Sequence, residues 1–164
     1  MARKKQTQNY WIKISYLFII FVAFVTINLY FSDLIIHEIQ SGDLLVNNDI
    51  FSLNYTQNTG AAFNLLHNYP FVLIGLSVTA LVLLFAYVIK YAGTMTYIGL
   101  FLISLMMSGI FCNLFERVQL GYVRDFIELR FVDFPIFNFS DIAINVSVIA
   151  IIFLLLKRAQ LKQL

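Results

Sequence analysis

Four long apolar stretches dominate the pattern of hydrophobic and polar positions along the chain. In order, they cover about residues 14–31, 69–89, 95–115 and 140–156. A helix needs about 20 mostly apolar residues to cross the hydrocarbon core of a bilayer. The pattern therefore predicts an all-α membrane protein with four transmembrane helices.

Two segments between these stretches have the shorter period that is typical of strands. Apolar and polar side chains alternate along residues 50–57. The apolar face holds Phe51, Leu53 and Tyr55, and the polar face holds Ser52, Asn54 and Thr56. Residues 123–131 also favour an extended chain, although a short interfacial helix fits them too. We expect a small extracytoplasmic β-rich element beside the four helices. The turn at 58–60, taken alone, favours a surface hairpin end.

The composition requires lipid as a solvent for this chain. It has 164 residues, 60% hydrophobic and 12% charged, and a soluble domain of that size cannot hide so much apolar surface. We find no internal repeat and no second domain, so residues 1–164 are expected to form a single domain. The net charge of +2 is too small to indicate nucleic-acid binding. Cys112 is the only cysteine, so it has no partner for an internal disulfide.

Charge predicts the orientation of the four spans. Basic residues flank them on one side: Arg3, Lys4, Lys5, Lys13, Lys90, Lys157, Arg158 and Lys162. The positive-inside rule assigns that side to the cytoplasm, so both termini are expected there. All nine acidic residues and both histidines fall in or beside the opposite loops, about 33–68 and 116–138. The first span is longer than a signal-peptide core and lacks a small-x-small cleavage site, so we expect a retained anchor.

Two acids stand out within these loops. Asp125 is the one acid on the apolar face of its predicted strand, whereas Arg124, Glu128 and Arg130 lie on the opposite, solvated face. Asp141 lies at the outer entrance to the last span, where Ser140 or Asp141 is a plausible N-cap. Capping alone would account for Asp141. However, ionisable residues at membrane depth are costly, and a pair at one boundary indicates function.

The third span carries a polar stripe. Gly109, Asn113 and Arg117 recur every four residues and share one helix face. Gly109 allows close helix approach, and Asn113 can hydrogen-bond to a neighbouring helix. Arg117 at the outer end of the span could pair with Glu116, Asp33 or an acid of the second loop. A packing face with a snorkelling arginine explains the stripe equally well.

Four motifs resemble those of lipoprotein signal peptidase, the signal peptidase II family, and together cover nearly the whole chain. They are Asn-x-Gly-Ala-x-Phe at 58–63, a run that ends Asn-x-x-Glu-Arg at 108–117, Gly-x-Val-x-Asp-Phe at 121–126 and Pro-x-Phe-Asn-x-Ser-Asp at 135–141. The resemblance implies four spans, cytoplasmic termini and an aspartic endopeptidase. It also implies the substrate, a bacterial prolipoprotein whose cysteine already carries diacylglycerol, with cleavage just before that cysteine.

The resemblance assigns roles to named residues. It implies Asp125 and Asp141 as the catalytic pair. Five residues would shape the site or bind the substrate: Asn58, Gly60, Asn113, Arg117 and Asn138. Four would support it: Asp33, Gly109, Glu116 and Gly121. We expect a monomer without metal or cofactor, in the bacterial cytoplasmic (inner) membrane, whose lipid it contacts, with the site on the extracytoplasmic face.

Several positions depart from the family pattern. Glu116 stands where the family has Asp, Ser108 and Cys112 replace glycines, and His37 replaces Lys. The longer side chain of Glu116 is expected to change its packing role. The two lost glycines imply looser packing of the third span. None of these departures affects the two catalytic aspartates.

Two carboxylates that share a proton can activate water and polarise a carbonyl. Asp141, near a helix N-terminus, is expected to be the better-stabilised anion, and Asp125 to hold the proton. Cys112 has no histidine within helical reach, which argues against a thiol nucleophile, and two separated histidines argue against zinc. A small transporter, a channel subunit or an assembly factor is the alternative outside enzymes, and an inactive relative is another.

Overall fold

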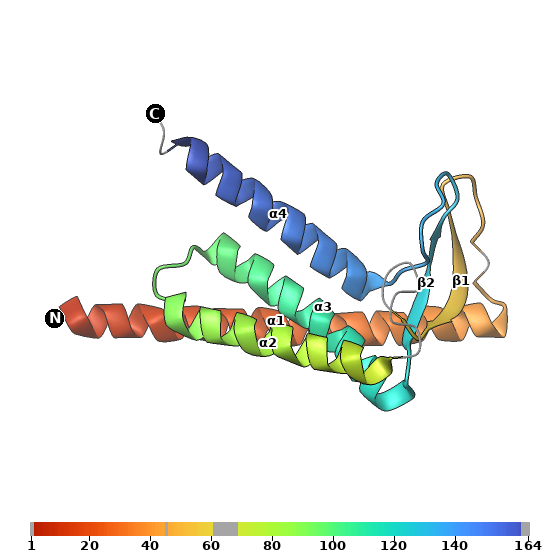
Figure 1. Ribbon diagram of the computed structural model, residues 1–164, viewed down its shortest axis with the longest axis horizontal. Helices are drawn as coiled ribbons and strands as arrows, with labels where there is room; N and C mark the ends of the chain where they lie inside the picture. The colour runs from red at the N-terminus through yellow and green to blue at the C-terminus, as the bar shows by residue number, and fades with distance from the viewer. Residues whose placement is uncertain (1, 45, 61–68, 162–164) are drawn as a thin grey trace.

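The computed structural model describes residues 2–44, 46–60 and 69–161, with side chains from residue 7 to 160. Within these ranges the elements are α1 (Ala2–Ser41), β1 (Phe51–Asn58), α2 (Pro70–Tyr91), α3 (Tyr97–Leu120), β2 (Val123–Leu129) and α4 (Phe139–Leu161) (Figure 1). Some positions lie outside the described residues: 61–63 of the first motif, His67, Lys162, and the side chains of Arg3, Lys4 and Lys5.

The prediction of four spans is confirmed, because α1, α2, α3 and α4 are each long and apolar enough to cross a membrane. The first helix is longer than the predicted span of about residues 14–31, since α1 continues to Ser41. Residues 32–41 contain neither proline nor glycine that would stop a helix. Gly42 ends it with a φ of 82°, in the left-handed region that favours glycine.

The helix α3 lies at the centre of the bundle, and α1, α2 and α4 all pack against it. Toward the end of the bundle that holds both termini of the chain, its apolar contacts form a buried cluster with α1 and α2. The cluster consists of Leu17, Val88, Ala92, Leu100, Ile103 and Met107. This packing makes α3 the frame against which the other elements are positioned.

Gly109 sets the distance between α3 and α4. A Cβ at this position would lie 2.6 Å from the main-chain oxygen of Ser140 and 2.8 Å from Cγ1 of Ile144. Ser108 and Cys112, which replace family glycines, are 2% and 1% exposed. Both small side chains are therefore buried within the bundle.

A two-stranded antiparallel sheet crosses one end of the bundle (Figure 1). Leu53 lies opposite Ile127 and Thr56 opposite Asp125, with an irregularity in register between the two pairs. On the other side of β2, Phe137 and Ile127 exchange main-chain hydrogen bonds of 3.0 and 2.9 Å. The segment that leads into α4 is therefore held to the sheet. The extended alternative is confirmed for residues 123–129, where β2 lies.

One residue on the predicted polar face of β1 is buried. Ser52 is 2% exposed, and its hydroxyl donates to Oε2 of Glu128 at 2.6 Å. Glu128 lies directly opposite on β2, so the strand pairing supplies the partner that a buried hydroxyl needs. The alternation of residues within β1 alone cannot predict this partner, which lies on the other strand.

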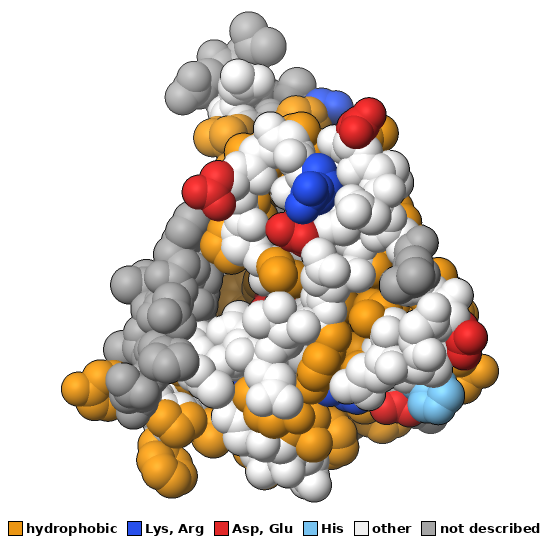
Figure 2. Space-filling view, turned by 90° about the vertical axis from the view of Figure 1, so that its right-hand side faces the viewer, with side chains coloured by type: hydrophobic (Ala, Val, Ile, Leu, Met, Phe, Trp, Pro, Cys, Tyr) orange, Lys and Arg blue, Asp and Glu red, His pale blue; other side chains and the backbone are white. Residues whose placement is uncertain are grey.

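The sheet and the acidic residues lie at the same end of the bundle. Figure 1 shows that α1 and α3 end there and that α4 begins there. Figure 2 looks onto this end, where acidic and basic side chains are scattered among uncharged groups. Chain regions far apart in sequence therefore meet at this end.

Candidate active site

Asn138 and Asp141 cap the start of α4 together, because the side chain of each accepts a hydrogen bond from the main-chain nitrogen of the other. Oδ1 of Asn138 accepts a hydrogen bond from the main-chain nitrogen of Asp141 at 3.0 Å. Oδ2 of Asp141 accepts one from the main-chain nitrogen of Asn138 at 3.1 Å. This is a capping box with Asn138 at the N-cap. The predicted cap at Ser140 or Asp141 is wrong, because Phe137 is held to β2 and α4 begins at Phe139, which leaves Asn138 at the N-cap.

Asp125 lies on β2 with its carboxylate turned into the protein. It is only 1% exposed, as expected for an acid on an apolar strand face. Nδ2 of Asn58, on β1, donates to Oδ2 of Asp125 at 2.7 Å. Nδ2 of Asn138 donates to Oδ1 at 2.9 Å. Each oxygen of this buried carboxylate therefore has an amide donor, which offsets part of the cost of burial.

Asn113 joins the second acid to the same network. Its Nδ2 donates to Oδ1 of Asp141 at 2.8 Å, and its Oδ1 accepts from Nδ2 of Asn138 at 3.2 Å. Because Asn138 also contacts Asp125, three asparagines bring the two carboxyl groups into one network. These residues come from β1, α3, β2 and the start of α4.

Burial is the largest influence on Asp125, and it raises the pKa of its carboxyl group to about 7. The hydrogen bond from Asn58 acts in the opposite direction, because it stabilises the anion. The negative charge of Asp141 raises the pKa further, and the hydrogen bond from Asn138 lowers it. A carboxyl group with this pKa is a proton donor near neutral pH.

The turn at 58–60 packs onto α3 rather than forming a surface hairpin end. The main-chain nitrogen of Gly60 donates to Oδ1 of Asn58 at 2.9 Å, which closes an Asx turn. Nη2 of Arg117 donates to the carbonyl oxygen of Gly60 at 2.9 Å. These contacts fix Asn58 beside Asp125, so the surface interpretation of this turn is wrong.

Glu116 and Asp33 pair with Arg124. Nη2 of Arg124 lies 2.8 Å from Oε1 of Glu116, and Nη1 lies 3.1 Å from Oδ1 of Asp33. The main-chain nitrogen of Arg124 also donates to Oε2 of Glu116 at 2.7 Å. One expectation is wrong here, because the Arg124 side chain is only 17% exposed. Among the described residues Arg117 forms no ion pair with Glu116 or Asp33, but the charge of Asp125, an acid of the second loop, acts on it.

Sequence reasoning therefore missed Arg124, the neighbour of Asp125 on β2. The signal for it is Gly121, which ends α3 with a φ of 85° and whose main-chain nitrogen donates to the carbonyl of Arg117. A left-handed residue after a helix redirects the chain. Here it turns β2 back toward the last turn of α3, so Glu116 and Arg124 meet.

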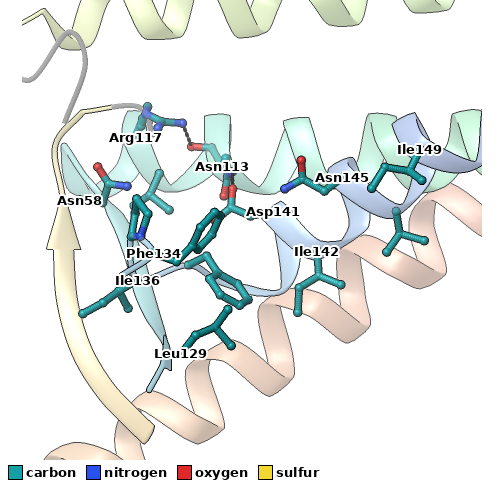
Figure 3. A pocket seen from close by; sticks show the side chains of 14 residues that line it. Asn58, Asn113, Arg117, Leu129, Phe134, Ile136, Asp141, Ile142, Asn145 and Ile149 are labelled. Atoms are coloured by element: carbon teal, nitrogen blue, oxygen red, sulfur yellow. Dashed lines mark hydrogen bonds between the residues drawn. The ribbon is translucent and has the colours of Figure 1, made fainter. Parts of the chain in front are cut away.

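A pocket of about 450 Å³ opens beside Asp141 (Figure 3). One end is polar and includes Asn58, Asn113, Arg117 and Asp141. The remaining wall is largely apolar and includes Leu129, Phe134, Ile136, Ile142, Val146 and Ile149. The pocket thus connects the carboxyl network to an apolar surface that runs along α4.

Comparisons with known proteins point to one family. The profile described as "Signal peptidase (SPase) II" matches residues 17–157. The chain is 40% identical over 108 residues to the lipoprotein signal peptidase of Streptococcus thermophilus strain CNRZ 1066, which covers 66% of this chain and 70% of that relative. It is 34% identical over 136 residues to the lipoprotein signal peptidase of Lactiplantibacillus plantarum, covering 82% and 89%.

Two solved structures, both described as those of a bacterial membrane enzyme, have a similar fold. One has a TM-score of 0.76 at 27% identity and covers 89% of this chain and 90% of its own. The other has a TM-score of 0.74 at 30% identity and covers 88% and 94%. The similarity therefore includes the helices and the sheet together.

Proposed function

The chain belongs to the signal peptidase II family of lipoprotein-processing membrane proteases, and on that premise we propose that it is an aspartic endopeptidase for diacylglyceryl-modified bacterial prolipoproteins. Cleavage falls just before the lipidated cysteine and releases the signal peptide. The apolar wall of the pocket supports a substrate of this kind. A scissile bond held at the membrane surface by its lipid needs catalytic acids at the same depth.

Asp125 and Asp141 are the proposed catalytic residues. The observation that carries this assignment is the pair of contacts made by Asn138, whose side-chain amide donates to Asp125 and whose main-chain nitrogen donates to Asp141. One residue thus orients both carboxyl groups. Asp141 also lines the pocket, where a water molecule and a peptide bond can reach it.

The two acids divide the proton transfers. The Asp141 anion takes a proton from water while the water oxygen bonds to the scissile carbonyl carbon, and Asp125 gives its proton to the carbonyl oxygen. The product is a neutral tetrahedral diol. When the carbon–nitrogen bond breaks, Asp141 delivers its proton to the leaving nitrogen and a hydroxyl proton returns to Asp125. The pair ends with the single proton with which it began.

The remaining polar residues position these two acids and the substrate. Asn58 and Asn113 each hold one carboxylate, and Arg117 supplies a positive charge that attracts both. We propose that the site faces the extracytoplasmic side of the bacterial cytoplasmic membrane, with both chain termini in the cytoplasm. Support for this orientation comes from Lys13, Lys90 and other basic residues beside the spans on the opposite side from the acids.

Cleavage of a synthetic lipobox peptide by the purified protein tests the proposed substrate. One peptide carries diacylglycerol on its cysteine, and a matched peptide carries a free thiol. Mass spectrometry of the products should show cleavage immediately before the modified cysteine and little cleavage of the free-thiol peptide. Equal cleavage of both peptides, or cleavage at another bond, would contradict the proposal.

A further inference from the structure

Asn145 is a polar residue of α4 that takes no part in the carboxyl network. It lies one helical turn after Asp141 and lines the same pocket. Figure 3 shows its amide turned toward Asn113 and Asp141. Among the described residues, its side chain has no hydrogen-bond partner. Its amide is therefore available to a group that enters the pocket.

The position of Asn145 makes an unpartnered amide costly. Its side chain is exposed on the surface of the protein, but it lies within the membrane-spanning part of α4, and the neighbouring pocket residues on that helix are Ile142, Val146 and Ile149. A polar group without a partner in such surroundings costs free energy. Ser147, two residues further along, satisfies its own hydroxyl by donating to the carbonyl of Ala143 at 2.6 Å.

The proposed function indicates which group fills this need, and the inference rests on it. A signal peptide must be extended near its cleaved bond to reach two acids, and an extended chain leaves its amide and carbonyl groups unpaired where water is absent. The side-chain amide of Asn145 has both an N–H donor and a carbonyl acceptor, so it can pair with both polar groups of a peptide backbone. The ester groups of diacylglycerol offer acceptors only.

We infer that Asn145 is a substrate-binding residue that hydrogen-bonds the main chain of the signal peptide on the N-terminal side of the cleaved bond. Four residues of helix separate it from Asp141 by about 6 Å along α4. An extended chain advances about 3.3 Å per residue. The contacted peptide group therefore lies about two residues before the bond that is cut.

Kinetics of Asn145 variants with the diacylated peptide test this inference. Asn145→Leu keeps the approximate shape but removes both hydrogen bonds, so KM should rise about tenfold while kcat stays the same. Asn145→Gln, which retains an amide, should restore much of the affinity. Val148→Leu, at another exposed position of α4 outside the pocket-lining set, is the matched control and should leave KM unchanged.

A scan of the substrate backbone locates the contact. In a set of diacylated peptides, an ester oxygen replaces the N–H group at each of the four residues before the cysteine, one at a time. One replacement, near the second residue, should raise KM for the wild type and have no further effect in Asn145→Leu. The inference would be overturned if the backbone replacement and Asn145→Leu had additive effects on KM at every position. It would also be overturned if replacing the lipid esters by ethers, rather than a backbone N–H by oxygen, raised KM in the wild type but not in Asn145→Leu.

Failure of the inference is distinguishable from failure of the proposed function. A wild type that cleaves the diacylated peptide, together with an Asn145→Leu variant of unchanged KM, would overturn the role of Asn145 alone. A wild type that does not cleave this peptide would overturn both.

Discussion

Asn138 and Asp125 are joined by a hydrogen bond of 2.9 Å from Nδ2 to Oδ1, which ties the N-cap residue of α4 to the middle of β2. The same asparagine caps α4 through its Oδ1 atom. The two functions use different atoms of one side chain. Substitution can therefore separate capping of the helix from orientation of Asp125.

Asn138→Ser keeps a good N-cap residue and removes the amide donor to Asp125. We expect the free energy of unfolding to stay near that of the wild type, while kcat falls about tenfold or more, because the lost donor would stabilise the carboxylate that forms as Asp125 gives up its proton. Asn138→Ala should lose activity and about 1 kcal/mol of stability. Thermal unfolding and peptide cleavage in the same detergent measure both effects. Equal stability of the two variants would contradict the capping role.

The pH dependence of cleavage should report the proton on Asp125. Because burial raises the pKa of Asp125 to about 7, kcat/KM should fall as the pH rises through that value and the proton is lost. The hydrogen bond from Asn58 favours the anion and lowers this pKa. Asn58→Leu should therefore move the alkaline limb to higher pH, by on the order of one unit.

Asn54→Leu is the control for this shift. Asn54 lies on the same strand, but its amide donates to Ser52 and Glu128 and not to an acid of the site. Its pH–rate profile should match that of the wild type. If Asn58→Leu moved the alkaline limb to lower pH, the assignment of the proton to Asp125 would be wrong.

Gly109→Ala should separate α3 from α4. The added Cβ would meet the main-chain oxygen of Ser140 at 2.6 Å, and this backbone cannot move aside without shifting Asp141. We expect a loss of about 1–3 kcal/mol in stability together with reduced kcat. Gly75→Ala on α2 is the matched control: nothing lies within 4 Å of its Cβ, so stability should stay the same or rise by about 0.5–1 kcal/mol. Similar losses in both variants would refute the packing explanation.

The ion pairs of Arg124 should differ in strength. The side chain of Glu116 is 8% exposed, whereas that of Asp33 is 78% exposed. Glu116→Gln leaves a largely buried guanidinium without its main partner and should cost about 3 kcal/mol. Asp33→Asn should cost less than about 1 kcal/mol, because water screens an exposed pair. Denaturant unfolding of both variants measures the difference, and equal costs would contradict the burial argument.

Long periodic elements could be predicted from the sequence because their signal is local. The second span was expected at 69–89 and α2 covers Pro70–Tyr91. Alternation located β1, whereas at β2 it left a short helix as an alternative. The cap of α4 could not be predicted, since it depends on the bridge between Ile127 and Phe137. That bridge becomes visible only when the sheet is assembled.

The site shows the same division between local and long-range signals. The resemblance to the family implied Asn58, Asn113 and Asn138 as site residues, and the structure brings all three into contact with an acid. The partner of Arg124 was missed because it depends on the direction in which the chain leaves Gly121. The sequence therefore predicted which side chains matter better than which pairs they form.

The central claim is that two carboxyl groups jointly activate one water molecule, and single-turnover cleavage of the diacylated peptide by Asp125→Asn and Asp141→Asn tests it most directly. Each variant is reconstituted in lipid, and its folding is checked by thermal unfolding. We predict that both remain folded and that neither cleaves the peptide, whereas the wild type does. Cleavage at a wild-type rate by either folded variant would contradict the account.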